Sequence, residues 1–315
     1  ALAVSDLDNF NIYVAHDKNE PIEGIWTDVL KICQRFNFPQ KRCRSVPIDF
    51  TLSAHLEAPS VGSFLTYARL YLASVLKEEC MLYLDSDVLV MRDLSELLLM
   101  MPKDTVCAAV QDKSSPQHSN DGYLIDGKEA SSESDYFNAG MLLLNTRMCQ
   151  EIDLLEQVKK IQPRITNLRF FDQTYLNIIL NGQWHKLSPI WNMQTTPRDP
   201  VPMKSDEGQT GIIHYIAEKK PWLTATLDLP NLLWHSIAKS IEIPITPEVE
   251  DELHHLISRF NQNKSNVLLR IQYYVYRLKF SSSKRSRAVY SQMEILKNQP
   301  WLNMWLTKKQ LTSIL

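Results

Sequence analysis

Met81-Leu-Tyr-Leu-Asp85-Ser-Asp87-Val-Leu-Val, residues 81–90, is the stretch that says most about the fold. Its first four residues have the apolar character of a short buried strand, and two carboxylates spaced two residues apart follow them. If the strand continued, alternation would point Asp85 and Asp87 to the same side. Converging carboxylates repel each other unless a cation lies between them, and hard oxygen ligands suit Mg²⁺ or Mn²⁺. The pair therefore indicates either a divalent-cation site or a strand-end turn with solvated aspartates, and spacing alone does not decide between them.

Around this stretch, short apolar runs alternate with helical patterns. Strands are predicted at residues 11–15, 44–47, 81–84, 105–110, 141–144, 184–187 and 211–215. Helices are predicted at residues 24–36, 63–76, 94–101, 149–161 and 172–181, the last with Asp172 at its N-cap position and a C-cap signal at Asn181-Gly182. This order predicts an α/β fold with a mainly parallel sheet and helices on both faces. Functional residues in such sheets gather at the carboxyl ends of strands.

The character of the sequence changes at about residue 227, where strand signals fade and helical ones dominate. We therefore expect an α/β domain at 1–226 and a helical, basic extension at 227–315. Between Leu253 and Met293 the chain has no acidic residue but has eight basic ones, Arg259, Lys264, Arg270, Arg277, Lys279, Lys284, Arg285 and Arg287. Such a helix is typical of one that binds an anionic membrane surface, although a solvated helix packed on the domain is the alternative.

The composition excludes some classes of protein. A formal net charge of −2 over 315 residues does not favour nucleic acid as a partner, and the chain has no apolar run of the length that a transmembrane helix needs. Five cysteines without a CxxC pair argue against a zinc site or disulfide framework and fit a reducing compartment, although Cys33 and Cys43 could pair. Ala1 to Val4 has the character of a helix tail, so we expect a strand that precedes this sequence.

Two further motifs lie at the ends or starts of predicted strands. His214 ends the strand G-I-I-H, so its imidazole is a candidate third metal ligand, and Lys220 lies six residues further on, where it could meet a phosphate. The motif Y-F-N-A-G at 136–140 combines small residues, which let a ligand approach the backbone, with Asn138, whose amide suits sugar hydroxyls. Taken singly, a structural histidine and a tight turn explain these residues more simply.

Two helical motifs add candidates. In the motif F-D-Q at 171–173, Gln173 would lie at a helix start, beside the positive end of the dipole, where it could face a ligand. In the motif Y-A-R at 67–69, Arg69 could fork onto a phosphate or a sugar hydroxyl. A simple helix cap at Asp172 and an exposed helical arginine are the plainer interpretations of these two motifs.

The order of these motifs is more specific than any one of them. Y-x-R, then Y-L-D-x-D, then F-N-A-G, then D-Q-x-x-x-N, then H-x-x-x-x-x-K-P-W resembles glycosyltransferase family 8 from about residue 10 to residue 225. The resemblance implies a GT-A (Rossmann-like) nucleotide-diphospho-sugar transferase fold with a helical C-terminal extension, dependence on Mn²⁺ (or Mg²⁺), and retention of anomeric configuration.

The resemblance also implies roles for single residues. Asp85, Asp87 and His214 match the metal ligands, and Lys220 matches a diphosphate contact. The matches around the donor sugar are Arg69, Asn138, Ala139, Asp172 and Gln173, of which Gln173 and Asp172 are the catalytic candidates, and Asp112 matches a carboxylate near sugar or acceptor. Two positions depart from the family pattern: Ala217 stands where a glycine is usual, and Thr174 stands where a second aspartate is common.

The function implied is transfer of a hexose, galactose or glucose, from a UDP-sugar to a glycan acceptor such as lipopolysaccharide core or another lipid-linked saccharide. The expected location is cytoplasmic, on the inner face of the membrane. Two alternatives remain open from the sequence. One is a catalytically degenerate member of the family that serves as a sugar-binding or scaffold protein. The other is a haloacid-dehalogenase-type phosphatase, whose Asp-x-Asp motif also follows an apolar strand.

Overall fold

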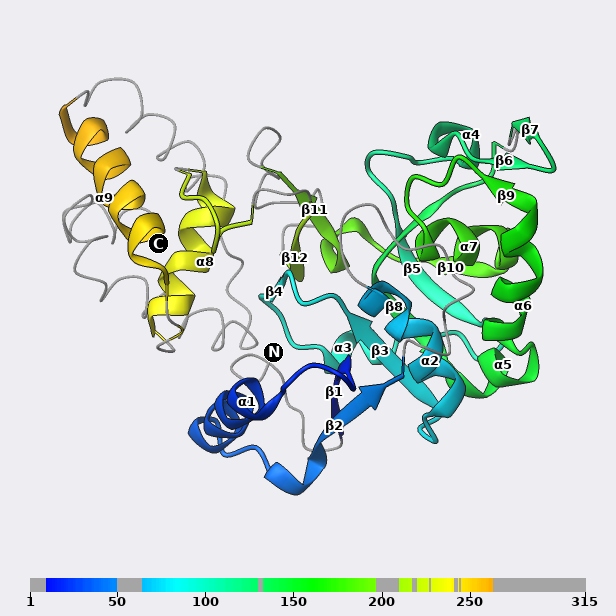
Figure 1. The fold of residues 1–315 in the computed structure, drawn as a ribbon, viewed down its shortest axis with the longest axis horizontal. Coiled ribbons are helices and arrows are strands. Elements are labelled where there is room, and N and C mark those ends of the chain that lie inside the picture. The colour runs from blue at the N-terminus through cyan, green and yellow to red at the C-terminus, as the bar shows by residue number, and fades with distance from the viewer. Residues whose placement is uncertain are drawn as a thin grey trace.

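The computed structural model describes residues 10–49, 64–129, 133–196, 210–216, 220–226, 228–240, 243 and 245–262. In Figure 1 they form an α/β body and, at one end of the molecule, two helices, α8 (Leu229–Ser240) and α9 (Pro247–Gln262). These two helices fall where the helical extension was expected, and the boundary at residue 226 stays a prediction. Most of the basic stretch, the first four residues and Ala217 lie outside the described residues.

A four-stranded mixed sheet forms the centre of the body. Its strand order is β10 (Trp184–Lys186), β5 (Cys107–Gln111), β8 (Phe137–Asn145) and β3 (Cys80–Leu84). β8 is antiparallel to both of its neighbours, whereas β10 and β5 are parallel. The expectation of a mainly parallel sheet is wrong here. The chain returns from β5 to β8 through a local excursion, not through a helix that crosses the sheet, and such a return gives an antiparallel pair.

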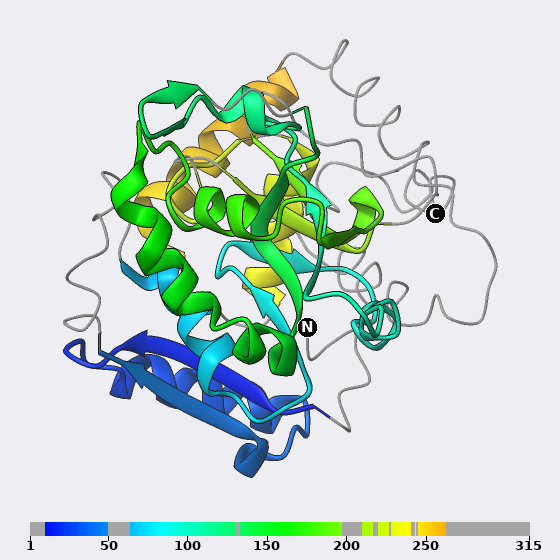
Figure 2. The same ribbon diagram turned by 90° about the vertical axis from the view of Figure 1, so that its right-hand side faces the viewer.

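A βαβ unit forms the edge of the body nearest the N-terminus. β1 (Ile12–Asp17) and β2 (Cys43–Ile48) pair in parallel and are connected by α1 (Glu23–Arg35). In Figure 2 this unit lies below the main sheet as a separate layer of two strands. Both strands and the helix were predicted within two residues of their observed ends.

The remaining strands are short, and most were not predicted. A three-stranded sheet has the order β11 (Met193–Thr195), β12 (Ile212–Tyr215) and β4 (Val88–Val90), and of these only β12 was expected. The excursion between β5 and β8 contains α4 (His118–Asp121) and a small hairpin. The strands of that small sheet are β6 (Leu124–Ile125), β7 (Lys128–Glu129) and β9 (Ile165–Thr166). Runs of two or three residues are too short to show a periodicity.

The core explains the apolar run at residues 141–144 of β8. Leu142 and Leu144 pack into a cluster on one face of the sheet, while Met141 and Leu143 pack into a cluster on the other. A strand that is buried on both faces reads as a continuous apolar run. The helices that contribute to the first cluster are α2 (Ala68–Val75), α5 (Thr146–Glu151), α6 (Leu154–Ile161) and α7 (Asp172–Ile179). The second face is covered by α3 (Ser95–Leu98) and the turn Pro189–Trp191.

Two helix predictions need correction. The helix expected at 149–161 is broken, because Asp153 has a φ of 48° and its carboxylate caps α6 by accepting the N–H of Glu156. At the start of α7 the N-cap residue is Phe171, and no side chain caps it. Asp172 is the first helical residue, and its carboxylate is directed to Thr66 and Arg69 instead.

Candidate active site

The Asp85–Asp87 segment lies where the chain passes from one sheet to another. β3 ends at Leu84 and β4 begins at Val88, so the two aspartates occupy a turn and not a continuing strand. The turn is held from both sides. The N–H of Asp85 donates to the carbonyl of Gly140 on β8 (2.8 Å), and the N–H of Tyr215 donates to the carbonyl of Asp87 (2.9 Å). The carboxylates therefore converge because two strands fix the turn, not because of strand alternation.

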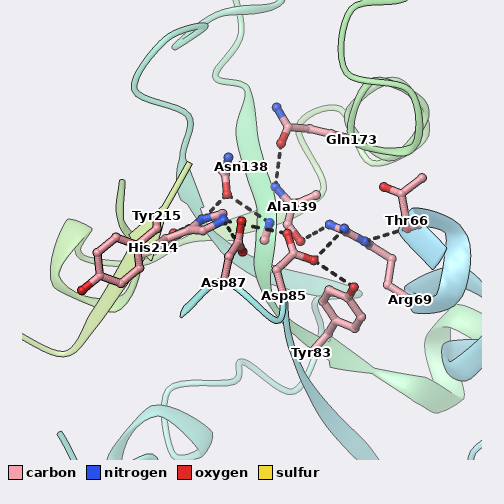
Figure 3. Close-up of polar contacts among 12 residues, drawn as sticks. Thr66, Arg69, Tyr83, Asp85, Asp87, Asn138, Ala139, Gln173, His214 and Tyr215 are labelled. Atoms are coloured by element: carbon pink, nitrogen blue, oxygen red, sulfur yellow. Dashed lines mark hydrogen bonds and ion pairs between the residues drawn. The ribbon is translucent and has the colours of Figure 1, made fainter. Parts of the chain in front are cut away.

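His214 on β12 completes a group of three potential ligands with these aspartates (Figure 3). Its Nε2 lies 3.2 Å from Asp87 Oδ1 and 3.9 Å from Asp85 Oδ2. The imidazole lies directly on the backbone of β8. A Cβ built at Gly140 would lie 2.1 Å from His214 Cε1, so a side chain at position 140 would displace the ring. The glycine of the F-N-A-G motif thus makes room for the histidine of another motif.

The three side chains fit a divalent cation. One ligand atom from each lies within 4.8 Å of the others. Asp87 Oδ1 is buried and faces His214 Nε2 of the same group. Two carboxylates and one imidazole are ligands that Mn²⁺ and Mg²⁺ accept. Burial opposes ionisation of Asp87, but His214 and Lys220 more than offset it, so its pKa lies well below the usual range and the carboxylate is charged.

Lys220 contacts the same carboxylate. Its Nζ lies 2.5 Å from Asp87 Oδ2 and 2.6 Å from the carbonyl oxygen of Tyr215. Both side chains of the ion pair are mostly buried, with 20% of Lys220 and 17% of Asp87 exposed. The lysine predicted to contact a phosphate is therefore in direct contact with one of the predicted metal ligands.

β8 is irregular at the point where it passes this group. Leu142 pairs with Ala109 of β5 and Asn138 pairs with Val110, so the three residues between them on β8 have no partner there. Irregularities of this kind re-aim side chains and backbone groups beside functional sites. The freed N–H of Ala139 donates to Gln173 Oε1 (2.9 Å), and its carbonyl accepts from Arg69.

Asn138 and Gln173 share one acceptor. Asn138 Nδ2 donates to Asp112 Oδ2 (3.0 Å), and Gln173 Nε2 donates to the same oxygen (3.2 Å). The other oxygen of Asp112 accepts the N–H groups of Ser114 and Ser115, each at 2.8 Å. The structure thus places Asp112 behind the two amides, with both of its oxygens occupied by protein donors.

Arg69 links the metal-ligand end to α7. Its Nη2 donates to Asp85 Oδ1 (2.9 Å), and its Nε lies 3.0 Å from Asp172 Oδ2 while donating to the carbonyl of Thr66 (3.1 Å). The guanidinium lies 4.5 Å from the ring centroid of Tyr83, whose hydroxyl also donates to Asp85. Burial raises the pKa of Asp172 to about 6, although Arg69 and Thr66 favour its ionised form. Arg69 is therefore a buried tie between two carboxylates and not the exposed helical arginine of the simpler interpretation.

These groups meet at one cavity of about 830 Å³. Seven of the ten predicted site residues line it, namely Arg69, Asp85, Asp87, Asn138, Asp172, Gln173 and His214. The other three, Asp112, Ala139 and Lys220, contact members of the first group. Three residues that position these side chains, Thr66, Tyr83 and Asn192, were not predicted from the sequence. Tyr83 stands inside the quoted strand, but Thr66 and Asn192 carry no local signal.

Solved structures with a similar chain path identify the fold. The galactosyltransferase LgtC, solved with donor and acceptor sugar analogs, aligns with a TM-score of 0.55 and 19% identity over 78% of this chain and 100% of its own. The bifunctional WbbM glycosyltransferase aligns with a TM-score of 0.59 and 18% identity over 79% of this chain and 48% of its own. The fold is therefore the GT-A glycosyltransferase fold, as the resemblance implied.

The model of Glycosyl transferase family 8 matches residues 10–226, and the chain belongs to that family. This result excludes the phosphatase alternative. Three relatives show the range of similarity. General stress protein A of Bacillus subtilis is 28% identical over 203 residues, which is 58% of this chain and 68% of that protein. The lipopolysaccharide 1,2-glucosyltransferase of Escherichia coli is 25% identical over 240 residues, 73% of this chain and 68% of that protein. The probable glycosyl transferase Gly of Streptococcus gordonii is 29% identical over 196 residues, 58% of this chain and 26% of that protein.

The chain matches only part of several relatives. It spans about a quarter of the Streptococcus gordonii protein and 20% of glycosyltransferase GlyD of Streptococcus pneumoniae. Within the described part of the chain, the search for membrane spans finds no helix that combines sufficient length with sufficient apolar character.

Proposed function

We propose that this chain transfers a hexose from a UDP-sugar to a saccharide acceptor with retention of anomeric configuration. The proposal rests on one observation: Asp85, Asp87 and His214 converge at a cavity whose wall also contains Asn138 and Gln173. A cation site beside amides suits a donor with a diphosphate at one end and a sugar at the other. The printed names of two similar proteins, a galactosyltransferase and a lipopolysaccharide glucosyltransferase, support galactose or glucose as the sugar and a lipid-linked saccharide as the acceptor.

In this proposal Asp85, Asp87 and His214 hold Mn²⁺ or Mg²⁺. An ion bound there supplies Lewis-acid stabilisation of the negative charge on the departing diphosphate. Lys220 acts on the same charge from the protein side. Because its ammonium now pairs with Asp87, it needs only to move from one anion to another.

The proposed chemical step is a front-face substitution. The bond between the anomeric carbon and the diphosphate oxygen breaks, and the acceptor oxygen bonds to that carbon from the same side. The acceptor proton moves to the departing phosphate oxygen. Gln173 donates from its amide to Asp112 and accepts from Ala139, so the amide is fixed at the cavity wall, where we propose that it orients the sugar.

A double displacement is the alternative step, and it needs a carboxylate nucleophile beneath the anomeric carbon. Asp172 is held by Thr66 and Arg69, and Asp112 is held by backbone and amide donors, which favours the front-face step. A glycosyl adduct trapped on either aspartate and detected by mass spectrometry would contradict this choice.

The experiment that tests the function is Mn²⁺-dependent hydrolysis of a panel of UDP-sugars. We expect one donor to be cleaved selectively, and we expect Asp87→Ala to abolish cleavage. Asp104→Ala, at an exposed aspartate on the surface, is the matched control and should keep full activity. If calorimetry detects no UDP binding and no donor is cleaved, the degenerate, sugar-binding alternative would take the place of this proposal.

We also propose that the catalytic domain, residues 1–226, is completed by a strand that precedes residue 1. Six consecutive residues, 10–15, line the cavity and include four of the six residues of β1, and all five residues of β3 line it as well. When every residue of a strand lines a cavity, its hydrogen-bonding edge faces that cavity. Among the described strands, β1 pairs with β2 and β3 pairs with β8, so both facing edges can accept a strand. Restoring the preceding segment should raise the midpoint of thermal unfolding, and an unchanged midpoint would count against this proposal.

The helical extension at 227–315 is proposed to bind an anionic membrane surface, which would place the enzyme on the cytoplasmic face beside a lipid-linked acceptor. Support comes from the eight basic residues and the lack of acidic ones between Leu253 and Met293. Flotation with anionic liposomes tests it. Binding should weaken as salt rises, and binding that is absent or indifferent to salt would contradict the proposal.

A further inference from the structure

A chain of hydrogen bonds runs from Asp112 to the metal-ligand group. Asn138 Nδ2 donates to Asp112 Oδ2 (3.0 Å), Asn192 Nδ2 donates to Asn138 Oδ1 (2.8 Å), and His214 Nδ1 lies 2.9 Å from Asn192 Oδ1. All four side chains are buried, with 2% to 7% of each exposed. Each of these side chains has protein partners on both sides, so the direction of each hydrogen bond depends on its neighbours.

The direction of this chain is set at Asp112. Both oxygens of this buried carboxylate accept hydrogen bonds. Oδ1 accepts the N–H groups of Ser114 and Ser115, and Oδ2 accepts from the amides of Asn138 and Gln173. An ionised carboxylate accepts hydrogen bonds and donates none. Asn138 must therefore turn its NH₂ group towards Asp112 and its oxygen away from it.

A backbone group enforces the same orientation independently. The N–H of Gly140 lies 3.0 Å from Asn138 Oδ1, and a backbone N–H cannot act as an acceptor. Flipping the Asn138 amide would therefore set two donors against each other at Gly140 and two acceptors against each other at Asp112 Oδ2. Only one orientation satisfies both ends.

The remaining links follow one by one. Because Asn138 presents its oxygen, Asn192 must present its NH₂ group to it. Asn192 then has only its oxygen left for His214, so His214 Nδ1 must carry the hydrogen. When the ring is neutral, as it must be to bind a cation, its single N–H is therefore on Nδ1 and Nε2 carries the lone pair. Nε2 is the nitrogen that lies 3.2 Å from Asp87 and 3.9 Å from Asp85.

We propose that Asp112 is a positioning residue that fixes the tautomer of His214 through the two amides of Asn138 and Asn192. We call the four side chains Asp112, Asn138, Asn192 and His214 the amide relay. Its outcome is a metal-ligand group in which the lone pair of Nε2 is already directed at the cation position. A metal-bound histidine commonly donates its other N–H to an oxygen acceptor that sets its tautomer. Here that acceptor is the amide oxygen of Asn192, and its orientation depends on a carboxylate three hydrogen bonds away from His214.

Asp112 also serves the sugar end of the cavity. The same Oδ2 accepts from Gln173 Nε2, and the backbone N–H of Ala139 holds Gln173 Oε1 (2.9 Å). One carboxylate oxygen thus orients an amide on the path to the metal and an amide at the donor sugar. This inference rests on the proposed function for its meaning in catalysis, but the relay itself is a property of the metal-free protein.

The test is the tautomer of His214 in metal-free protein, measured by long-range ¹H–¹⁵N correlation NMR. At a pH at which the ring is neutral, wild type should show the Nδ1–H form alone, although Asp87 Oδ1 lies 3.2 Å from Nε2 and favours a hydrogen there. Asp112→Asn keeps the size of the side chain, but where its NH₂ group faces Asn138 only the N–H of Gly140 still holds that amide, so the Nε2–H form should become detectable. Asn192→Ala interrupts the relay without touching Asp112 and should do the same. Asp126→Asn, at an exposed aspartate, should leave the tautomer unchanged.

Manganese affinity, measured by calorimetry or by the signal of free Mn²⁺ in electron paramagnetic resonance, is the second readout. Loss of a histidine's supporting contact typically weakens metal binding about 10- to 100-fold, and we expect this loss in Asp112→Asn and Asn192→Ala but not in Asp126→Asn. If both relay variants keep a pure Nδ1–H form, the inference is wrong, whatever the activity. If the tautomer responds while wild type cleaves no UDP-sugar, the relay stands and the proposed function fails.

Discussion

Replacing Lys220 should change two affinities in opposite directions. The ammonium of Lys220 lies 2.5 Å from Asp87 Oδ2, and that carboxylate is one of the three proposed metal ligands. Metal binding at Asp87 must weaken this ion pair, whereas diphosphate binding gains a cation from it. Lys220→Met keeps much of the length of the side chain and removes the charge. We therefore expect it to bind Mn²⁺ more tightly in the absence of UDP and to bind UDP more weakly in the presence of Mn²⁺.

The size of the effect follows from the geometry of the pair. Four fifths of each side chain is buried, since 20% of Lys220 and 17% of Asp87 remain exposed. A hydrogen bond between charged groups in such a setting contributes about 1.5–3 kcal/mol net. Losing it before the metal binds should tighten Mn²⁺ binding roughly 10- to 100-fold, at about 1.4 kcal/mol for each factor of ten. The loss of UDP affinity should be of similar size, because the same ammonium is withdrawn from the phosphates.

Calorimetric titration measures both affinities on one protein sample. Titrations with Mn²⁺ alone, and then with UDP at saturating Mn²⁺, are compared between wild type and Lys220→Met. Lys239→Met, at an exposed lysine near the end of α8, is the control and should change neither affinity. If Lys220→Met binds Mn²⁺ no more tightly than wild type, the ion pair does not compete with the metal and the reasoning fails. Weaker binding of both ligands would refute it as well.

Two further predictions concern supports of the site, and a third concerns a buried histidine of α8. Gly140→Ala should weaken Mn²⁺ binding by more than about tenfold, because the new Cβ would lie 2.1 Å from the His214 ring, while Gly24→Ala, which has open space around it, should be neutral. Arg69→Met should lower the free energy of unfolding by about 3–5 kcal/mol, because it leaves two carboxylates without their buried cation. Urea unfolding should show a larger loss at pH 8 than at pH 5, because Asp172, with a pKa of about 6, is mostly protonated at pH 5. Burial lowers the pKa of His235 to about 4, so between pH 4 and 6.5 the unfolded chain binds a proton that the folded chain does not. Wild type should therefore gain up to about 3 kcal/mol of stability as the pH rises from 4 to 6.5, and His235→Phe should lack this gain.

The sequence predicted the long elements because their periodicity is visible within each of them. α1 was found from its helical spacing, residues 141–144 of β8 were found from their apolar run, and the order of the motifs identified the family and hence the fold. The direction of β8 was not predictable in the same way. Its apolar run fits a buried strand of either direction, and the excursion between β5 and β8 has too little periodic pattern to show that it stays on one side of the sheet.

The site was predicted as a set of residues but not as a set of contacts. Asp85, Asp87 and His214 carry the chemistry of a metal site in their side chains, so the type of residue and its place at a strand end suggested them. Asn192 has no such mark, because an asparagine after a tryptophan is compatible with any turn. Its function comes from tertiary contacts with Asn138, 54 positions earlier in the chain, and His214, 22 positions later.

The one specific error at the site, the N-cap assigned to Asp172, shows how tertiary contacts override a local rule. Asp172 is a good cap by type, yet its carboxylate is drawn to Arg69, and Phe171 before it adopts a strained φ of 43°. The start of α7 is then fixed by other means. Gln173 Oε1 accepts a hydrogen bond from the N–H of Ala139 on β8. The hydroxyl of Thr174 donates to the buried Asp121 (2.7 Å). A helix start held by three tertiary contacts needs no cap of its own. Strain retained at such a place is consistent with selection for the position of Gln173 and not for the stability of the helix.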